Sequence, residues 1–162
     1  MHVLIVYGSQ FGTTERLARE MADAISALHE VDVVGTHEAE KLPGTQIDLL
    51  VVGAPTQFKG HRLLVRGFLK HLEEQGFGGC PAAAFDTRSH GDRGETGSAA
   101  ESIALMLSGA GCNLLVPAES FSVTAMRGPL DEGELQRSRA WISGVVRSVH
   151  PVHPVEGVPV GV

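Results

Sequence analysis

Short apolar runs alternate with amphipathic runs along most of this chain. The apolar runs cover residues 3–7, 31–34, 47–52 and 81–85. The first of them has no polar interruption, which is typical of a strand that is buried on both faces of a sheet. A last strand is predicted in two parts, over residues 114–116 and 120–123.

The amphipathic runs predict four helices. The apolar face of the first helix carries Leu17, Met21, Ile25 and Leu28. These residues recur at spacings of three or four, as residues on one helical face do. Thr13 or Thr14 is expected to cap the start of this helix. The other three helices are predicted around an apolar stripe over residues 64–72, and over residues 98–110 and 131–149.

Strands that alternate with helices predict an α/β fold, with five parallel strands in a doubly wound sheet and helices on both faces. One domain is expected over residues 1–150, followed by a Pro/Val-rich tail over residues 151–162. Ligands of such sheets bind beyond the carboxyl ends of the strands. The candidate site therefore lies in the loops at residues 8–14, 54–61 and 86–97.

Composition narrows the class of protein further. The chain has 162 residues and a net charge of −6, which disfavours a protein built to grip nucleic acid. No apolar run approaches the roughly 20 residues of a membrane helix, and the apolar run at the N-terminus is too short for a signal peptide. A cytoplasmic protein without a membrane span is expected. Cys80 and Cys112 are expected to be buried thiols rather than a disulfide.

The three loops lack several well-known catalytic patterns. The first loop has neither the Gly-x-Gly-x-x-Gly fingerprint of dinucleotide sites nor the lysine of a nucleotide triphosphatase loop. No Gly-x-Ser-x-Gly elbow of a hydrolase is present. What remains is a turn from Ser9 to Thr14 that contains hydroxyls, one glycine and no cation. Such a turn before a helix either binds a phosphate through N–H groups and hydroxyls or simply caps the helix.

Three segments together resemble the flavodoxin family. The segment Ser9-Gln10-Phe11-Gly12-Thr13-Thr14 resembles its phosphate loop, Thr/Ser-x-x-Gly-x-Thr. The segment Gly53-Ala54-Pro55-Thr56-Gln57-Phe58 resembles its second flavin loop, and Phe85-Asp86-Thr87-Arg88 with Gly91-Asp92 resembles a third. The order of strands and helices matches over residues 2–149. The resemblance implies a flavodoxin-like sheet with strand order 2-1-3-4-5 and bound FMN.

The resemblance also implies a role for each loop. The first loop would hold the FMN phosphate, and the other two would hold the isoalloxazine ring, with Phe58 stacked on it. No catalytic side chain and no metal site are predicted. The residues implied to bind FMN are Ser9, Gln10, Phe11, Gly12, Thr13, Thr14, Pro55, Thr56, Gln57, Phe58, Thr87, Arg88, His90, Gly91 and Asp92.

Two features depart from the family pattern. The third loop has no tyrosine to stack on the ring, because the one tyrosine of the chain is Tyr7. The flavin loops also hold more basic than acidic residues, namely Lys59, His61, Arg62, Arg88, His90 and Arg93 against Asp86, Asp92 and Glu95. Cations near the ring favour an anionic reduced flavin, so a less strongly reducing flavin than in typical carriers is expected.

The leading hypothesis is an FMN-binding protein that transfers electrons with a redox partner protein. Two alternatives stay open. One is an FMN-dependent oxidoreductase of the quinone reductase type, which acts on a quinone-type small molecule. The other is a flavin-free interaction domain that has kept the fold. An electron carrier is favoured over an oxidoreductase, and the sequence leaves the donor, the acceptor and the oligomeric state open.

Overall fold

The computed structural model describes residues 1–9, 11–40, 46–56, 61–75, 78–89, 98–125 and 127–149, with the side chains of the fourth range described from residue 65 onward. Its strands are β1 (His2–Tyr7), β2 (Glu30–Gly35), β3 (Leu49–Pro55), β4 (Pro81–Ser89), β5 (Asn113–Leu114) and β6 (Glu119–Val123). They form a parallel sheet in the order β2-β1-β3-β4-β5, and β6 also pairs with β4. The predicted strand order is confirmed, with β5 and β6 as the two parts of the last strand.

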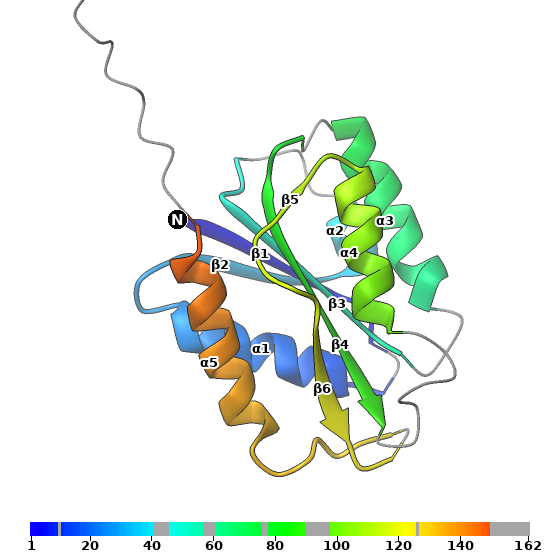
Figure 1. Ribbon diagram of the computed structural model, residues 1–162, viewed down its shortest axis with the longest axis vertical. Coiled ribbons are helices and arrows are strands. Elements are labelled where there is room, and N and C mark those ends of the chain that lie inside the picture. The colour runs from blue at the N-terminus through cyan, green and yellow to red at the C-terminus, as the bar shows by residue number, and fades with distance from the viewer. Residues whose placement is uncertain are drawn as a thin grey trace, which may run out of the picture.

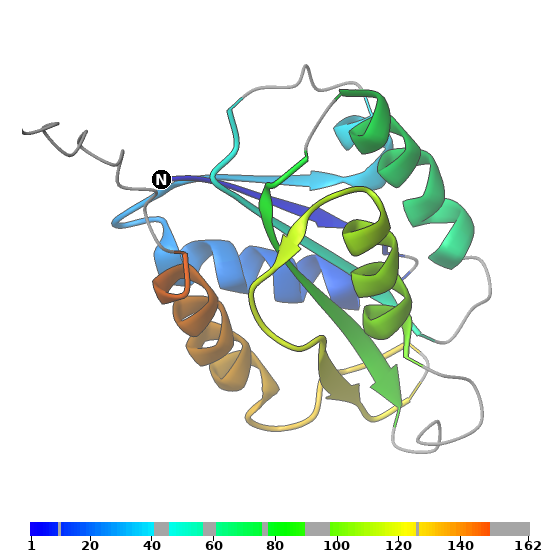
Figure 2. The same cartoon turned by 45° about the horizontal axis from the view of Figure 1, so that its top comes forward.

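Helices cover both faces of this sheet (Figure 1 and Figure 2). Two of them, α1 (Thr13–Ile25) and α5 (Glu134–Arg147), lie on one face. The other face carries α2 (Thr36–Ala39), α3 (His61–Gln75) and α4 (Ala99–Gly109). The predicted doubly wound architecture is therefore confirmed, while α2 is a short helix that the sequence pattern did not predict.

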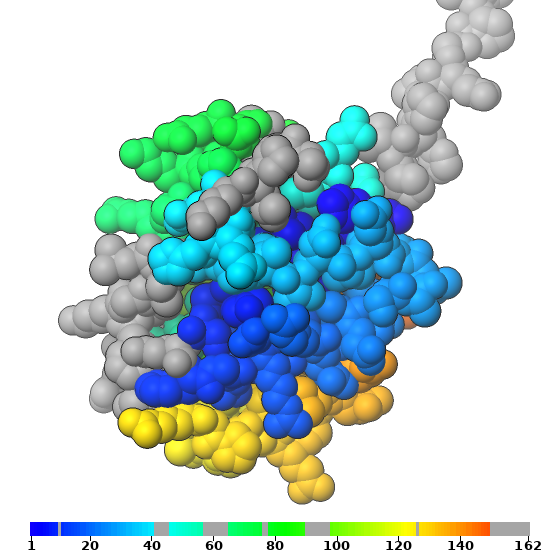
Figure 3. Space-filling view, turned by 180° about the vertical axis from the view of Figure 1, so that it is seen from behind, coloured from blue at the N-terminus to red at the C-terminus, as the bar shows by residue number. Residues whose placement is uncertain are grey.

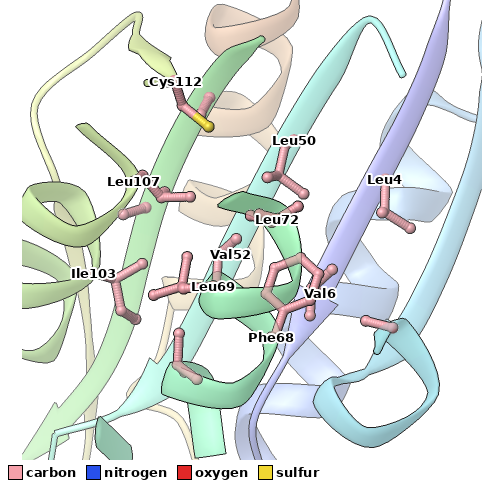
Figure 4. Packing of buried hydrophobic residues seen from close by; sticks show 14 of the residues in the cluster. Leu4, Val6, Leu50, Val52, Phe68, Leu69, Leu72, Ile103, Leu107 and Cys112 are labelled. Carbon is pink, nitrogen blue, oxygen red and sulfur yellow. The ribbon is translucent and has the colours of Figure 1, made fainter. Parts of the chain in front are cut away.

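The central strands send their side chains alternately into two cores. Leu4 and Val6 of β1 belong to the core under α3 and α4, which Figure 4 shows from close by. Val3 and Ile5 belong to the core under α1 and α5. All four side chains are at most 3% exposed. Helices on both faces thus explain why β1 has no polar interruption.

Three aromatic rings join the last strands to the last helix. The ring of Phe85 on β4 lies edge-to-face with the rings of Phe121 on β6 and Trp141 on α5, at centroid distances of 6.2 and 6.1 Å. Phe121 and Trp141 are themselves 5.9 Å apart and nearly perpendicular. Such edge-to-face pairs add to the free energy gained from burying the rings, so the middle of β4 is packed against β6 and α5.

Several predicted helix boundaries are wrong. Gly12, with φ 85° and no side-chain hydrogen bond, is the N-cap of α1. Thr13 and Thr14 therefore lie inside the helix instead of capping it. Leu28 lies beyond the end of α1 and is 84% exposed, so it does not belong to the apolar face. Helix α5 begins at Glu134, three residues later than predicted, behind Gly133 with φ 84°.

Two strands run further than the sequence pattern predicts. β3 continues through Gly53 to Pro55, and β4 continues through Asp86 to Ser89. The reason is pairing, because the carboxyl end of β4 is bonded on one side to β3 and on the other to β6. Residues 54–55 and 86–89, which were expected in loops, therefore lie in the sheet.

Cys80 and Cys112 are buried thiols that are not joined in a disulfide, as predicted. Burial raises the pKa of the Cys80 thiol to about 11 and also raises the pKa of the Cys112 thiol. The predicted tail, residues 151–162, lies outside the described residues. Within the part of the chain that the structure describes, no helix is long and apolar enough to cross a membrane.

Candidate functional site

The carboxyl ends of β1, β3 and β4 meet at one edge of the sheet. The N–H of Gly8, just after β1, donates to the carbonyl oxygen of Gly53 at 2.9 Å. The N–H of Thr56, just after β3, donates to the carbonyl oxygen of Thr87 on β4 at 2.9 Å. These two bonds fix the starts of the first two predicted loops and the end of β4 relative to one another.

The turn before α1 presents hydrogen-bond donors and no acid. Ser9 Oγ accepts a hydrogen bond from the N–H of Gly12 at 3.0 Å. The first bond inside the helix runs from the N–H of Arg16 to the carbonyl oxygen of Gly12. Helix geometry therefore leaves the N–H groups of Thr13 and Thr14 without an acceptor inside the helix. A Cβ built on Gly12 would meet nothing within 4 Å, so the turn is open above this residue.

The two threonines of the turn differ in their surroundings. Thr14 is 2% exposed, and its hydroxyl shares a hydrogen bond of 3.0 Å with the hydroxyl of Thr87 on β4. Thr13 is half-buried, and a Cβ built on Gly128 would lie 2.9 Å from its Oγ1. Thr14 thus anchors the turn to the sheet, while Thr13 faces the segment that leads to α5.

That segment also brings a cation to the turn. The guanidinium carbon of Arg127 lies 5.2 Å from the ring centroid of Phe11, which is 42% exposed. Figure 3 shows the start of α1, in blue, directly against the yellow segment that contains Arg127. A groove of about 380 Å³ between them is lined by Phe11, Gly12, Thr13, Arg16, Arg127 and residues 128–130. The sequence pattern could not show this cation, because it is more than 110 residues away along the chain.

Tyr7 is held by a hydrogen bond to α1 and is not placed in the third predicted loop, where a tyrosine could stack on a flavin ring. Its hydroxyl donates to Glu15 Oε1 at 2.8 Å, and Arg19 donates to the same oxygen at 2.9 Å. Burial and the hydrogen bond to Glu15 raise the pKa of Tyr7. The hydrogen bonds from Tyr7 and Arg19 lower the pKa of Glu15. This cluster fastens the end of β1 to the first turns of α1.

A buried carboxylate lies at the carboxyl ends of β3 and β4. Asp86 is 0% exposed, although the sequence pattern places it among the charges of a predicted loop. Its Oδ2 accepts hydrogen bonds from Thr56 Oγ1 at 2.8 Å, Ser98 Oγ at 2.6 Å and the N–H of Ala100 at 3.0 Å. Ser98 also caps α4 by accepting from the N–H of Glu101. The sequence pattern offered one weak signal for this cluster, an acidic residue at the end of an otherwise apolar strand.

The structure brings together the predicted site residues that it describes. They stand at the carboxyl ends of β1, β3 and β4 and are Ser9, Phe11, Gly12, Thr13, Thr14, Pro55, Thr56, Thr87 and Arg88. The remaining ones lie outside the described residues and are Gln10, Gln57, Phe58, His90, Gly91 and Asp92. Among the described residues, no group of three or more His, Cys, Asp or Glu side chains could hold a metal ion.

The fold and these loops define an α/β protein with a hydroxyl-bearing turn at the carboxyl edge of a parallel sheet. The family profile described as Flavodoxin matches residues 5–141, and the chain belongs to the flavodoxin family. A comparison with curated protein sequences finds no match.

Solved flavodoxin structures share this fold. Flavodoxin 2 from Bacillus cereus has a TM-score of 0.74 and 21% identity, with 91% of this chain and 99% of that chain covered. A flavodoxin from the domain Archaea has a TM-score of 0.68 and 17% identity, with 92% and 99% covered. Rubredoxin oxygen:oxidoreductase from Desulfovibrio gigas has a TM-score of 0.65 and 15% identity, but only 36% of that longer chain is covered. At such identities the likeness shows the fold alone.

Proposed function

We propose that this protein binds FMN and transfers electrons between redox partners. The observation that carries the proposal is the open turn before α1, where helix geometry leaves N–H groups without acceptors next to the hydroxyls of Ser9 and Thr13. A phosphate monoester suits such a set of neutral donors at the positive end of a helix dipole. Membership of the flavodoxin family supports the same ligand.

Residues of the first loop would bind the phosphate of FMN, and residues of the other two loops would bind its ring. Ser9, the backbone of residues 10–14 and the hydroxyl of Thr13 would hold the phosphate. Thr14 would act indirectly, because its hydroxyl is engaged with Thr87. Pro55 to Phe58 would line one side of the ring, and Thr87 to Asp92 would follow its edge.

The chain itself supplies binding and orientation in this proposal. When bound, FMN supplies one- and two-electron redox chemistry. The strand ends would fix where the ring lies, because β3 and β4 are paired as far as Pro55 and Thr87. No side chain has to act as an acid or a base, which suits a carrier that meets a redox partner protein.

A flavin titration tests this function. FMN added to the purified protein should lose fluorescence in a saturable way, and riboflavin, which lacks the phosphate, should bind more weakly. Ser9→Ala should weaken FMN binding by about tenfold, since hydrogen bonds to charged groups contribute about 1.5–3 kcal/mol, and should leave riboflavin binding unchanged. Ser26→Ala removes a hydroxyl at the far end of α1 and serves as the matched control.

The outcomes separate the alternatives. A protein that does not bind FMN contradicts the proposal and favours a flavin-free interaction domain. A protein that binds FMN and also reduces quinones with NAD(P)H over many turnovers is an oxidoreductase instead of a carrier.

A further inference from the structure

Asp86 is the one charged side chain that is fully buried among the residues the structure describes. One oxygen, Oδ2, receives all three of its hydrogen bonds, from Thr56, Ser98 and Ala100. The other oxygen, Oδ1, is buried and has no hydrogen-bond partner among the residues that the structure describes. The hydrogen bonds of the described residues therefore use one acceptor oxygen of this carboxylate and leave the other without a donor. A buried charge is costly unless it is compensated.

The partners of Asp86 stand at the ends of both predicted ring-binding loops. Thr56 is the last residue before residues 57–60, and Ser98 is the first residue after residues 90–97. Asp86 itself lies opposite Ala54 in the β3–β4 register, four positions before His90. A second bond, from the N–H of Ala99 to Thr56 Oγ1 at 3.2 Å, closes the same cluster. One carboxylate oxygen thus ties together the end of β3, the end of β4 and the start of α4.

We propose that Asp86 is a positioning residue that also tunes the flavin. Through Thr56 and Ser98 it fixes the ends of β3 and α4 from which the two predicted ring-binding loops start and to which they return, and its buried negative charge would oppose the gain of electrons by that ring. This inference rests on the proposed function. The effect of this charge is opposite in sign to the effect expected of the basic residues in the loops, and a charge in the low-dielectric interior acts more strongly than a charge that is screened by water. Arg88, half-buried two residues further along the same face of β4, offsets part of this field.

Asp86→Asn separates the charge from the geometry. Asparagine keeps the volume and one carbonyl oxygen that can accept the three hydrogen bonds, but it carries no charge. Ser98→Ala is the matched variant, since it removes one of the three donors and keeps the charge. In the FMN-loaded proteins, the midpoint potential of the bound flavin and the dissociation constant of oxidised FMN are measured. Together they give the relative affinities for oxidised and reduced FMN.

For D86N we expect a higher midpoint potential than in the wild type, equivalent to about a tenfold gain in the affinity for reduced over oxidised FMN. For S98A we expect weaker binding of both forms by the same factor and a wild-type potential. Asp86→Ser, a second neutral variant, gives the same readout if D86N does not fold.

Each remaining outcome decides the question. A neutral variant that folds, binds FMN and keeps the wild-type potential overturns the role of Asp86 and leaves the proposed function standing. A wild-type protein that binds no FMN overturns both, and the titration described above, which is carried out first, distinguishes that result.

Discussion

Gly53 lies against the ring of its partner across the β3–β4 ladder, Phe85. A Cβ built on Gly53 would fall 2.1 Å from Phe85 Cζ, which is far inside contact distance. The ring cannot simply swing away, because it packs edge-to-face on Phe121 and Trp141. The glycine is therefore required by close approach, and its φ angle is not the reason.

Gly53→Ala should lower the free energy of unfolding by about 2–3 kcal/mol, the usual cost of overpacking a well-packed core. The measurement is chemical denaturation followed by circular dichroism. Gly78→Ala is the matched control, because a Cβ there meets nothing within 4 Å, and it should change stability little. Phe85→Leu added to G53A should recover part of the loss, since the smaller side chain gives way. A G53A protein as stable as the wild type would show that the Phe85 ring has another place to go.

At the scale of helices and strands, the sequence pattern predicted the elements and their order, apart from the short helix α2, but it did not predict where they end. The pattern of apolar residues is a local property, so β1, with its unbroken apolar run, and the buried face of α1 could be predicted from their own residues. The ends of β3 and β4 depend on their pairing with each other and with β6. The N-cap of α1 is Gly12, whereas the two threonines that follow it made a threonine cap the expected one.

In the candidate site, too, local features could be predicted from the sequence and long-range contacts could not. The hydroxyl-bearing turn could be predicted because all its residues are neighbours in the sequence. Asp86 and Arg127 could not, because their partners come from other parts of the chain. Whether a strand-end carboxylate points into water or into the protein is decided by tertiary packing.

The contact between α1 and β4 can be tested with a pair of variants. Thr14→Val keeps the shape of a buried side chain but removes its hydroxyl, which leaves the hydroxyl of Thr87 without this partner. The free energy of unfolding should fall by about 1–2 kcal/mol, because a buried hydroxyl that loses its partner bears the desolvation cost. FMN affinity should also fall, since the first turn of α1 loses its anchor.

Thr87→Val alone should behave in the same way. In the double variant both hydroxyls are gone, so the cost should be smaller than the sum of the two single costs. Strict additivity in this cycle would mean that the two hydroxyls do not interact in solution.

On the scale of the whole molecule, the carboxyl ends and the amino ends of the strands carry different groups of polar residues. The carboxyl edge carries the candidate site, whereas the amino edge carries a polar clamp around His2. The N–H of His2 donates to Asp48 Oδ2 at 2.7 Å. Its ring nitrogens lie 2.6 Å from Asp32 Oδ2 and 3.2 Å from the carbonyl oxygen of Gln46. Both of these partners are acceptors, and only the protonated imidazole has an N–H for each of them.

The clamp makes stability depend on pH near neutrality. The hydrogen bond to Asp32 is the largest cause that raises the pKa of His2 above its usual 6.5. The folded protein thus holds this proton to a higher pH than the unfolded chain does. The stabilisation is fully present below about pH 6.5 and is lost as the pH rises through the folded pKa. Glu15, whose pKa is lowered, changes the stability only at more acidic pH. Cys80, whose pKa is about 11, changes it only at more alkaline pH.

Denaturation curves recorded from pH 6 to pH 8.5 should therefore show the wild type losing stability relative to His2→Gln as the pH rises. Asp32→Asn removes the partner that raises the pKa, so it should flatten the same difference while the histidine stays in place. A D32N protein that keeps the full wild-type pH dependence would contradict the clamp, because the slope would then come from another group. The FMN affinity of both variants should stay at the wild-type value, since β1 separates the clamp from the candidate site by its full length.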